Sequence, residues 1–164
     1  MTESEPLIDA EQAAFMQSGV SIALASRNAQ NIPSVVRGLG CWIAPDRRMV
    51  KVFLNRHQGA ALLADIAAHG AIAVVFNEPS TLRTIQLKGA GATIVACAEQ
   101  DVPITDAHHR QFATEVLPLG FSEVFTRTLF ECPLPAIAAV LFAPVAAFSQ
   151  TPGPHAGQPL RAGA

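Results

Sequence analysis

The sequence has little charge and few cysteines. Lys and Arg number 11 and Asp and Glu number 13 among 164 residues, which gives a net charge of -2. This number of basic residues is too small to form a basic surface that binds a nucleic-acid phosphate backbone. We therefore expect no nucleic-acid partner. Cys41, Cys97 and Cys132 are odd in number and lie among apolar residues. This pattern favours buried thiols over disulfides or metal ligands, and we expect no metal site.

Long apolar runs and an apolar leader are also absent. Strictly apolar runs are short, such as Ala71–Phe76, whereas about 20 residues are needed to span a bilayer. The first five residues, Met1–Glu5, are acidic and polar, unlike the basic and then apolar start of a secretory signal. We therefore expect a cytoplasmic protein with no membrane partner.

Hydrophobic residues make up 50% of the chain, and their spacing predicts a mostly antiparallel domain. Apolar residues at helical spacing predict helices over Asp9–Ser18, Gln58–His69 and Thr105–Leu117, the last capped by Thr105. Alternation and turn residues predict strands over Val20–Ala25, Val35–Ile43, Met49–Leu54, Ala71–Phe76, Thr81–Ala98 and Ala136–Phe148. Gly89–Gly91 bends the fifth strand and Pro144 interrupts the sixth.

About six strands with two or three helices predict an α+β domain built on a small antiparallel barrel. We expect the domain to span residues 1–148. Residues 149–164 contain three Gly and three Pro, which predicts an irregular Pro/Gly-rich tail.

Polar side chains on these strands are the candidate functional groups, because the sequence has no catalytic-triad, HExxH, P-loop or dinucleotide-binding motif. A period of two places Thr84, Gln86 and Lys88 on one face of their strand. Arg37 is the sole charge in an apolar strand, where it is either an ion-pair or rim residue or a contact to an anionic ligand. The run Asn55–Gln58 leads into a helix N-terminus, which favours phosphate.

The order of five segments resembles the FMN-binding split barrels related to pyridoxamine 5'-phosphate oxidase. The resemblance covers about residues 12–98 and rests on Val35–Gly40, Val52–Asn55, the following helix, Ala73–Phe76 and Arg83–Ala90. It implies a six-stranded split barrel with two or three peripheral helices. It further implies a homodimer that holds FMN in grooves at the subunit interface.

The resemblance also implies a set of cofactor contacts. Carried over by position, Arg37 and the Arg56–His57 turn contact the phosphate, and Phe53 and Asn55 line the cofactor. Thr84 or Gln86 faces the isoalloxazine ring. Gly38 and Lys88 complete the set.

The chain departs from the true oxidase at its C-terminus, where the substrate-binding arginine and histidine motif is missing. We therefore expect a protein that is not a pyridoxamine 5'-phosphate oxidase, with an unknown small-molecule substrate and unknown catalytic residues. Three interpretations stay open: an FMN-dependent oxidoreductase, a non-enzymatic flavin or haem carrier or sensor, and a cofactor-free dimeric interaction protein. Haem would need an axial ligand, for which His57 is the candidate.

Three further features carry expectations. His108 and His109 are adjacent on a predicted helix, and we expect them on its solvated face. Trp42 is expected to pack in the core or an interface. The segment Gln150–Gly157 resembles a motif of a small-protein branch of the family. We expect it to lie across the dimer seam near the flavin groove, with Gln150 or Thr151 supplying a hydrogen bond and His155 reaching the cofactor or the substrate.

Overall fold

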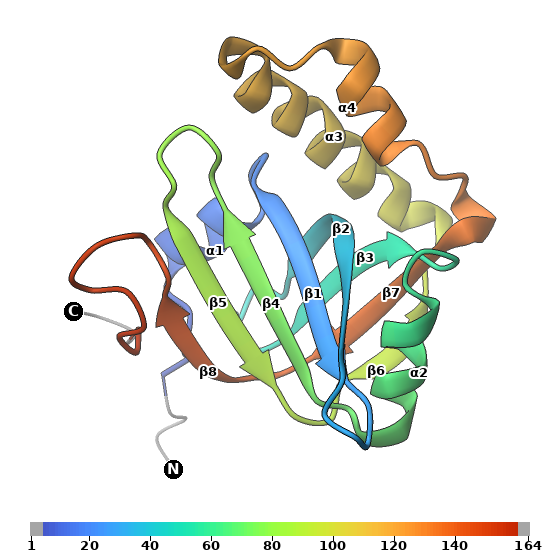
Figure 1. Cartoon of the computed structure of the whole chain (residues 1–164), viewed down its shortest axis with the longest axis vertical. Coiled ribbons are helices and arrows are strands. Elements are labelled where there is room, and N and C mark those ends of the chain that lie inside the picture. Colours follow the sequence, from blue (N-terminus) through green and yellow to red (C-terminus); the bar gives the residue numbers. More distant parts are fainter. Residues whose placement is uncertain (1–4, 161–164) are drawn as a thin grey trace.

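The computed structural model describes residues 5–160, which form an α+β fold around one curved, unclosed antiparallel sheet (Figure 1). The strand order is β6-β7-β3-β2-β1-β4-β5-β8. The strands are β1 (Ser21–Arg27), β2 (Pro33–Ile43), β3 (Val50–Asn55), β4 (Ile72–Asn77), β5 (Thr84–Gly89), β6 (Thr93–Ala96), β7 (Ile137–Phe142) and β8 (Pro144–Ser149). The helices are α1 (Ala10–Met16), α2 (Ala60–His69), α3 (Val102–Val116) and α4 (Glu123–Phe130). Residues 1–4 and 161–164, which belong to the predicted acidic start and tail, lie outside the described residues.

The α+β antiparallel class is confirmed, and the prediction of six strands is wrong because two predicted strands each divide. The segment Thr81–Ala98 becomes β5 and β6, which lie at different ends of the strand order. It leaves the sheet at Gly91, whose φ is +91° and whose backbone N–H donates to the Gly70 carbonyl at 3.0 Å. The segment Ala136–Phe148 divides at Pro144, which has no N–H to continue the ladder.

The helices α1 and α2 were predicted, whereas the hairpin of α3 and α4 was predicted only in part. Helix α3 begins at Val102, so Thr105 lies inside it and donates a hydrogen bond back to the Val102 carbonyl instead of capping the helix. Helix α4 was not predicted. Ser122 caps it by accepting a hydrogen bond from the Phe125 N–H.

The core has two parts on opposite faces of the bent sheet. The first lies between the inner face of the curved sheet and helices α1 and α2. Its largest fully buried members include Phe76, Phe142 and Leu24. The second lies between the α3–α4 hairpin and strands β2, β3 and β7, and consists of Leu39, Phe53, Phe112, Val116, Phe130, Ile137 and Ala139. No helix in the described chain is long and apolar enough to cross a membrane.

Candidate functional site

The outer face of strands β2, β1, β4, β5 and β8 carries the candidate site. One row of paired residues crosses all five strands: Arg37, Ala23, Val75, Gln86 and Phe148. Residues paired across neighbouring strands point to the same face, and the residues between them, such as Ile22 and Val74, point into the first core. In Figure 1 no helix lies in front of β1, β4 and β5. We call this outer surface the bare face.

Arg37 is the most unusual residue of the bare face. Its side chain is half-buried and its Nη1 donates a long hydrogen bond of 3.4 Å to the Ser21 hydroxyl. No carboxylate pairs with it among residues 5–160. Burial lowers the pKa of the guanidinium below its ordinary value. A shallow hollow of about 280 Å³ lies beside it, lined by Ser21, Ala23 and Val35 among others. An anion in this hollow would stabilise the buried charge.

Gly38 sets the direction of its neighbours. It pairs with Leu54, and a Cβ on Gly38 would lie 2.6 Å from Cγ2 of Ile22. Its missing side chain therefore points into the first core, where no larger residue fits. Arg37 and Asn55 are the neighbours of this pair, so they lie on the opposite, outer face, with Arg37 in the middle of β2 and Asn55 at the end of β3.

The turn from β3 into α2 is held by Asn55. Its Oδ1 accepts hydrogen bonds from the backbone N–H of His57 at 3.0 Å and Gln58 at 3.1 Å. The side chains of Arg56 and His57 are exposed. Helix α2 begins at Ala60 without a side-chain cap, and the Ala60 N–H donates only a long hydrogen bond of 3.4 Å to the His57 carbonyl. Arg56 and His57 thus follow directly from Asn55, which lies beside Arg37 across β2 and β3.

Phe53 does not share this exposure. Its side chain is fully buried in the second core, so it has no surface with which to touch a ligand in the single chain. The resemblance implied a place beside the cofactor for it. The structure places it beneath the α3–α4 hairpin, and its place beside the cofactor stays a prediction.

The predicted contacts on β5 lie three strands away from Arg37, about 14 Å at the usual strand spacing. The Thr84 hydroxyl accepts from Asn77 Nδ2 at 2.7 Å and donates to the Leu82 carbonyl at 2.8 Å, so both of its roles are filled. Gln86 is half-buried and Lys88 is exposed on the same face. One chain therefore presents two separate groups of predicted contacts.

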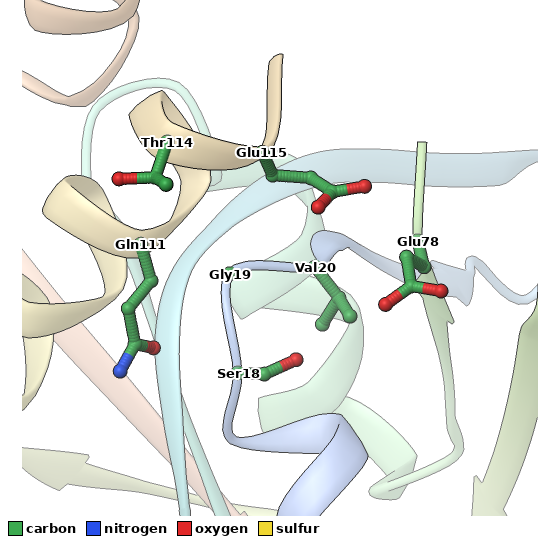
Figure 2. A pocket seen from close by; sticks show the side chains of 7 residues that line it. All are labelled: Ser18, Gly19, Val20, Glu78, Gln111, Thr114 and Glu115. Atoms are coloured by element: carbon green, nitrogen blue, oxygen red, sulfur yellow. The ribbon is translucent and has the colours of Figure 1, made fainter. Parts of the chain in front are cut away.

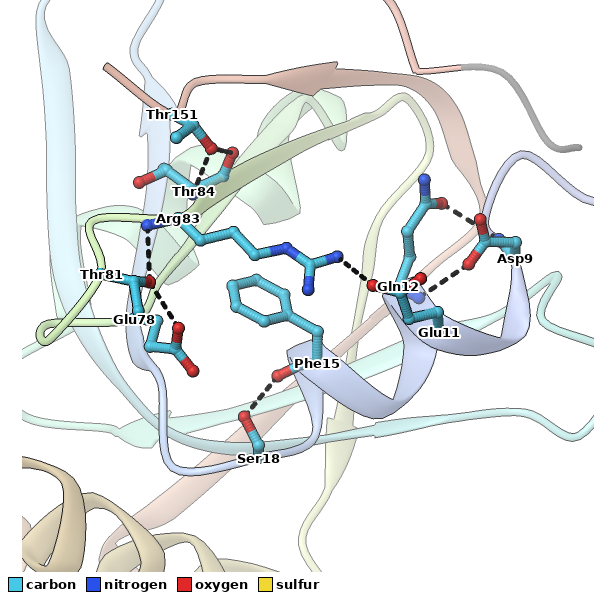
Figure 3. A network of polar contacts seen from close by, with 10 residues as sticks. All are labelled: Asp9, Glu11, Gln12, Phe15, Ser18, Glu78, Thr81, Arg83, Thr84 and Thr151. Carbon is cyan, nitrogen blue, oxygen red and sulfur yellow. Dashed lines mark hydrogen bonds and ion pairs between the residues drawn. The ribbon is translucent and has the colours of Figure 1, made fainter. Parts of the chain in front are cut away.

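The segment after β8 folds back along β5 and β8. Gln150 Nε2 donates to Gln86 Oε1 at 3.1 Å, and the Thr151 hydroxyl accepts from the Thr84 N–H at 2.9 Å (Figure 3). The Leu160 N–H then donates to the Ala147 carbonyl at 2.8 Å. Gln150 and Thr151 thus bond to strand β5 of their own chain, and the hydrogen bond expected of them at a dimer seam stays a prediction. The place at a dimer seam and the role of His155 stay predictions.

Figure 3 also shows how α1 is fastened to the loop between β4 and β5. Arg83 forms an ion pair of 3.0 Å with Glu11, and its guanidinium lies 4.4 Å from the centroid of the Phe15 ring. These contacts close one end of the first core. They leave Arg83 engaged within the chain.

His108 lies in the interior, so its predicted solvated position is wrong. It is 3% exposed, because α3 approaches β2 at Gly40, where a Cβ would lie only 3.2 Å from the His108 Cβ. Nδ1 donates to the Ser18 carbonyl at 3.2 Å, and the buried Nε2 has no hydrogen-bond partner among residues 5–160. Burial lowers the pKa of His108 to about 4, so the imidazole is neutral at pH 7. His109 is half-buried and stacks on Phe130.

A second hollow, of about 260 Å³, lies between α3 and the start of β1 (Figure 2). Glu78 and Glu115 line it, and both carboxylates accept hydrogen bonds from the β4–β5 turn, Glu78 from Thr81 and Glu115 from the Ser80 N–H. The negative charge of these two carboxylates disfavours the binding of a phosphate in this hollow. No group of three potential metal ligands occurs in residues 5–160.

The small residues of the bare face were not singled out in the sequence. Ala23, Ala25, Ala73 and Val75 alternate with buried Ile22, Leu24, Val74 and Phe76. Strands that are apolar on both faces are typical of sheets covered on both sides. The sequence therefore contains a signal, small apolar residues on the outer side of these strands, that another surface covers this face.

The sequence matches no protein-family model and no curated protein. The structure is similar to HupZ of Group A Streptococcus, with a TM-score of 0.56, 15% identity, and coverage of 92% of this chain and 99% of that one. It is similar to a candidate pyridoxamine 5'-phosphate oxidase from Lactobacillus delbrueckii (TM-score 0.54, 14% identity, 90% and 97% coverage). It is also similar to an F420 reductase (TM-score 0.53, 14% identity, 82% and 93% coverage). The chain therefore has the fold of the split barrels related to pyridoxamine 5'-phosphate oxidase.

Proposed function

We propose that this chain is an FMN-binding flavoprotein that acts as an oxidoreductase on a small molecule. The observation that carries the proposal is Arg37, a half-buried cation with no carboxylate partner among the described residues. Phosphate is the part of FMN that would satisfy it. The exposed Arg56 and His57 and the uncapped start of α2 follow Asn55, which lies beside Arg37 across β2 and β3, and they suit the same anion.

The remaining residues of the bare face suit the rest of the cofactor. Ala23, Val75 and Phe148 form an apolar surface that excludes water from a planar ring. Gln86 offers an amide for hydrogen bonding at the far end of the same row. When bound, the flavin supplies the electron transfer, and the protein binds and orients it. The fold shared with an F420 reductase supports the oxidoreductase assignment.

A homodimer is part of this proposal. The bare face is apolar on a chain that is already apolar inside, which is typical of a surface covered by a partner. A two-fold axis on this face would allow one FMN to contact β2 of one chain and β5 of the other. That arrangement joins the two groups of predicted contacts, which lie about 14 Å apart in one chain.

Absorbance and titration of the purified protein test the cofactor. We expect flavin bands, and FMN binding at least about ten-fold tighter than riboflavin binding, since one charge-assisted contact contributes about 1.5–3 kcal/mol. Equal affinities would contradict the phosphate site. A Soret band would assign haem instead, and no bound chromophore after titration with FMN would contradict a flavoprotein.

Assay with pyridoxamine 5'-phosphate and oxygen tests the limits of the proposal. We expect no steady production of pyridoxal phosphate, because the C-terminal arginine and histidine motif of the oxidase is missing from the sequence. Steady turnover of this substrate would restore the oxidase interpretation.

A further inference from the structure

Large apolar side chains are concentrated at the end of the α3–α4 hairpin. Ten large hydrophobic residues are exposed in the described chain, and five of them lie within nine residues of sequence. These five, which we call the hairpin tip, are Leu117, Leu119, Phe121, Val124 and Phe125, with exposed fractions of 41–61%. Scattered exposed hydrophobic residues are normal, whereas a contiguous group indicates a binding surface.

The hairpin tip does not cover the chain's own core. Helix α4 buries Thr126 and Phe130, and Phe130 belongs to the second core. The rings of Phe121 and Phe125 instead contact each other, with centroids 5.0 Å apart. The two rings are therefore already ordered by each other, so a partner that covers them loses little side-chain entropy.

The hairpin tip lies beside the bare face. The Ser80 N–H donates to Glu115 Oε1 at 2.9 Å, which fastens the β4–β5 turn to the last turn of α3. Leu82, on the same turn, is 52% exposed. Figure 1 shows the end of the hairpin above the loop that joins β4 and β5. Leu82 thus places one exposed apolar side chain on the turn that is bonded to the hairpin.

We propose that the hairpin tip packs on a second copy of this chain and forms the outer part of the dimer interface. This inference rests on the homodimer in the proposed function and names a surface beyond the bare face. A two-fold axis on the bare face would bring each tip against the other chain, so the two tips are buried in two equivalent contacts at the margin of the interface.

The area of the bare face supports this choice of partner. Five strands with about seven residues along each make a plane of roughly 24 Å by 24 Å, about 580 Å². A standard stable interface covers about 800 Å² on each partner. The bare face alone is therefore too small. The hairpin tip adds apolar area at its margin, and aromatic residues of this kind are enriched in interfaces.

The test compares two double variants of the full chain by light scattering and sedimentation over a range of protein concentrations. Phe121→Ser with Phe125→Ser removes the tip rings, and Ile94→Ser with Val145→Ser is the control. The control pair is also exposed, at 39% and 60%, and lies on β6 and β8 outside the tip. We expect the tip variant to raise the dimer dissociation constant at least about ten-fold. The control should change it less than about two-fold, and circular dichroism of dilute protein should show that both variants keep the wild-type fold.

A third variant separates this inference from the proposed function. Val35→Glu places a charge on the bare face, where Val35 is 70% exposed. If Val35→Glu dissociates the dimer and the tip variant behaves as the control does, the inference is overturned and the bare-face dimer stands. If the tip variant dissociates and Val35→Glu does not, the tip contact is supported and the bare-face interface fails. A monomeric wild-type chain overturns both, and tip-dependent binding to phosphatidylcholine vesicles would then assign the patch to a lipid surface.

Discussion

The two outer faces of the sheet are built differently. Strands β3 and β7 carry large apolar residues on their outer side, such as Phe53 and Ile137, and the α3–α4 hairpin covers them. The bare face carries small apolar residues, such as Ala23 and Val75, together with Arg37 and Gln86. The chain thus supplies its own cover where the outer residues are large. Where they are small and flat and a cation is unpaired, we infer that a cofactor and a second copy supply the cover.

The largest expected effect separates the two faces by stability. Phe53→Ala should lower the free energy of unfolding by about 3–5 kcal/mol, because it opens a cavity in the second core. Val75→Ala, on the bare face, should cost about 1 kcal/mol or less in the isolated chain. Urea unfolding of dilute, FMN-free protein measures both. Equal losses would mean that the bare face is as tightly packed as the covered one.

The covered face should also respond to acid through His108. Its pKa is lowered from 6.5 to about 4 in the folded chain, so the unfolded state binds a proton first as the pH falls. Stability should therefore be constant above about pH 6.5, fall between about pH 6.5 and 4, and lose about 3 kcal/mol in total. The substitution His108→Asn keeps a hydrogen-bond donor near the Ser18 carbonyl and removes the titratable imidazole.

Urea unfolding at a series of pH values compares the wild-type chain with His108→Asn. The variant should lose stability at all pH values and show a flatter dependence between pH 6.5 and 4. Identical slopes in the two proteins would contradict the buried neutral imidazole.

Arg37→Ala should weaken FMN binding at least about ten-fold, since one charge-assisted contact contributes about 1.5–3 kcal/mol. Riboflavin affinity should change little, because riboflavin has no phosphate. Arg27→Ala is the matched control, since Arg27 is exposed at the end of neighbouring strand β1. Titration followed by flavin fluorescence measures all three proteins. A parallel loss of riboflavin and FMN affinity would show that Arg37 acts only on the fold.

Removal of the residues after Ser149 should have the smallest effect. The truncation deletes the hydrogen bonds of Gln150 to Gln86 and of Thr151 to Thr84 at the edge of the bare face. We expect faster FMN loss or a looser dimer by a few-fold, corresponding to ~1 kcal/mol. Stopped-flow dissociation of FMN and light scattering measure the two outcomes. If neither the FMN dissociation rate nor the dimer changes, the segment has no role in cofactor binding or dimerisation.

Local sequence signals predicted the first two helices and the strands up to β4. Asp9 caps α1 by accepting a hydrogen bond from the Gln12 N–H, and Gly70 ends α2 with φ at +69°. The alternation on β5 also placed Gln86 and Lys88 on the face opposite buried Ile85 and Leu87. Each of these signals acts over a few residues, so the sequence alone displays it.

Contacts between distant segments account for the differences. The division of Thr81–Ala98 depends on the approach of Gly91 to Gly70, and the burial of His108 depends on where α3 meets Gly40. Neither approach is visible in local periodicity. The burial of Phe53 likewise depends on the α3–α4 hairpin that covers it. Helix α4 buries one apolar residue, Phe130, so its own sequence gives little indication of this packing.

The most direct test of the bare face is size-exclusion chromatography with in-line light scattering and flavin absorbance. We expect FMN to elute with the dimer, and we expect the monomer formed on dilution to carry no flavin. A monomer of one chain that retains FMN would contradict this expectation.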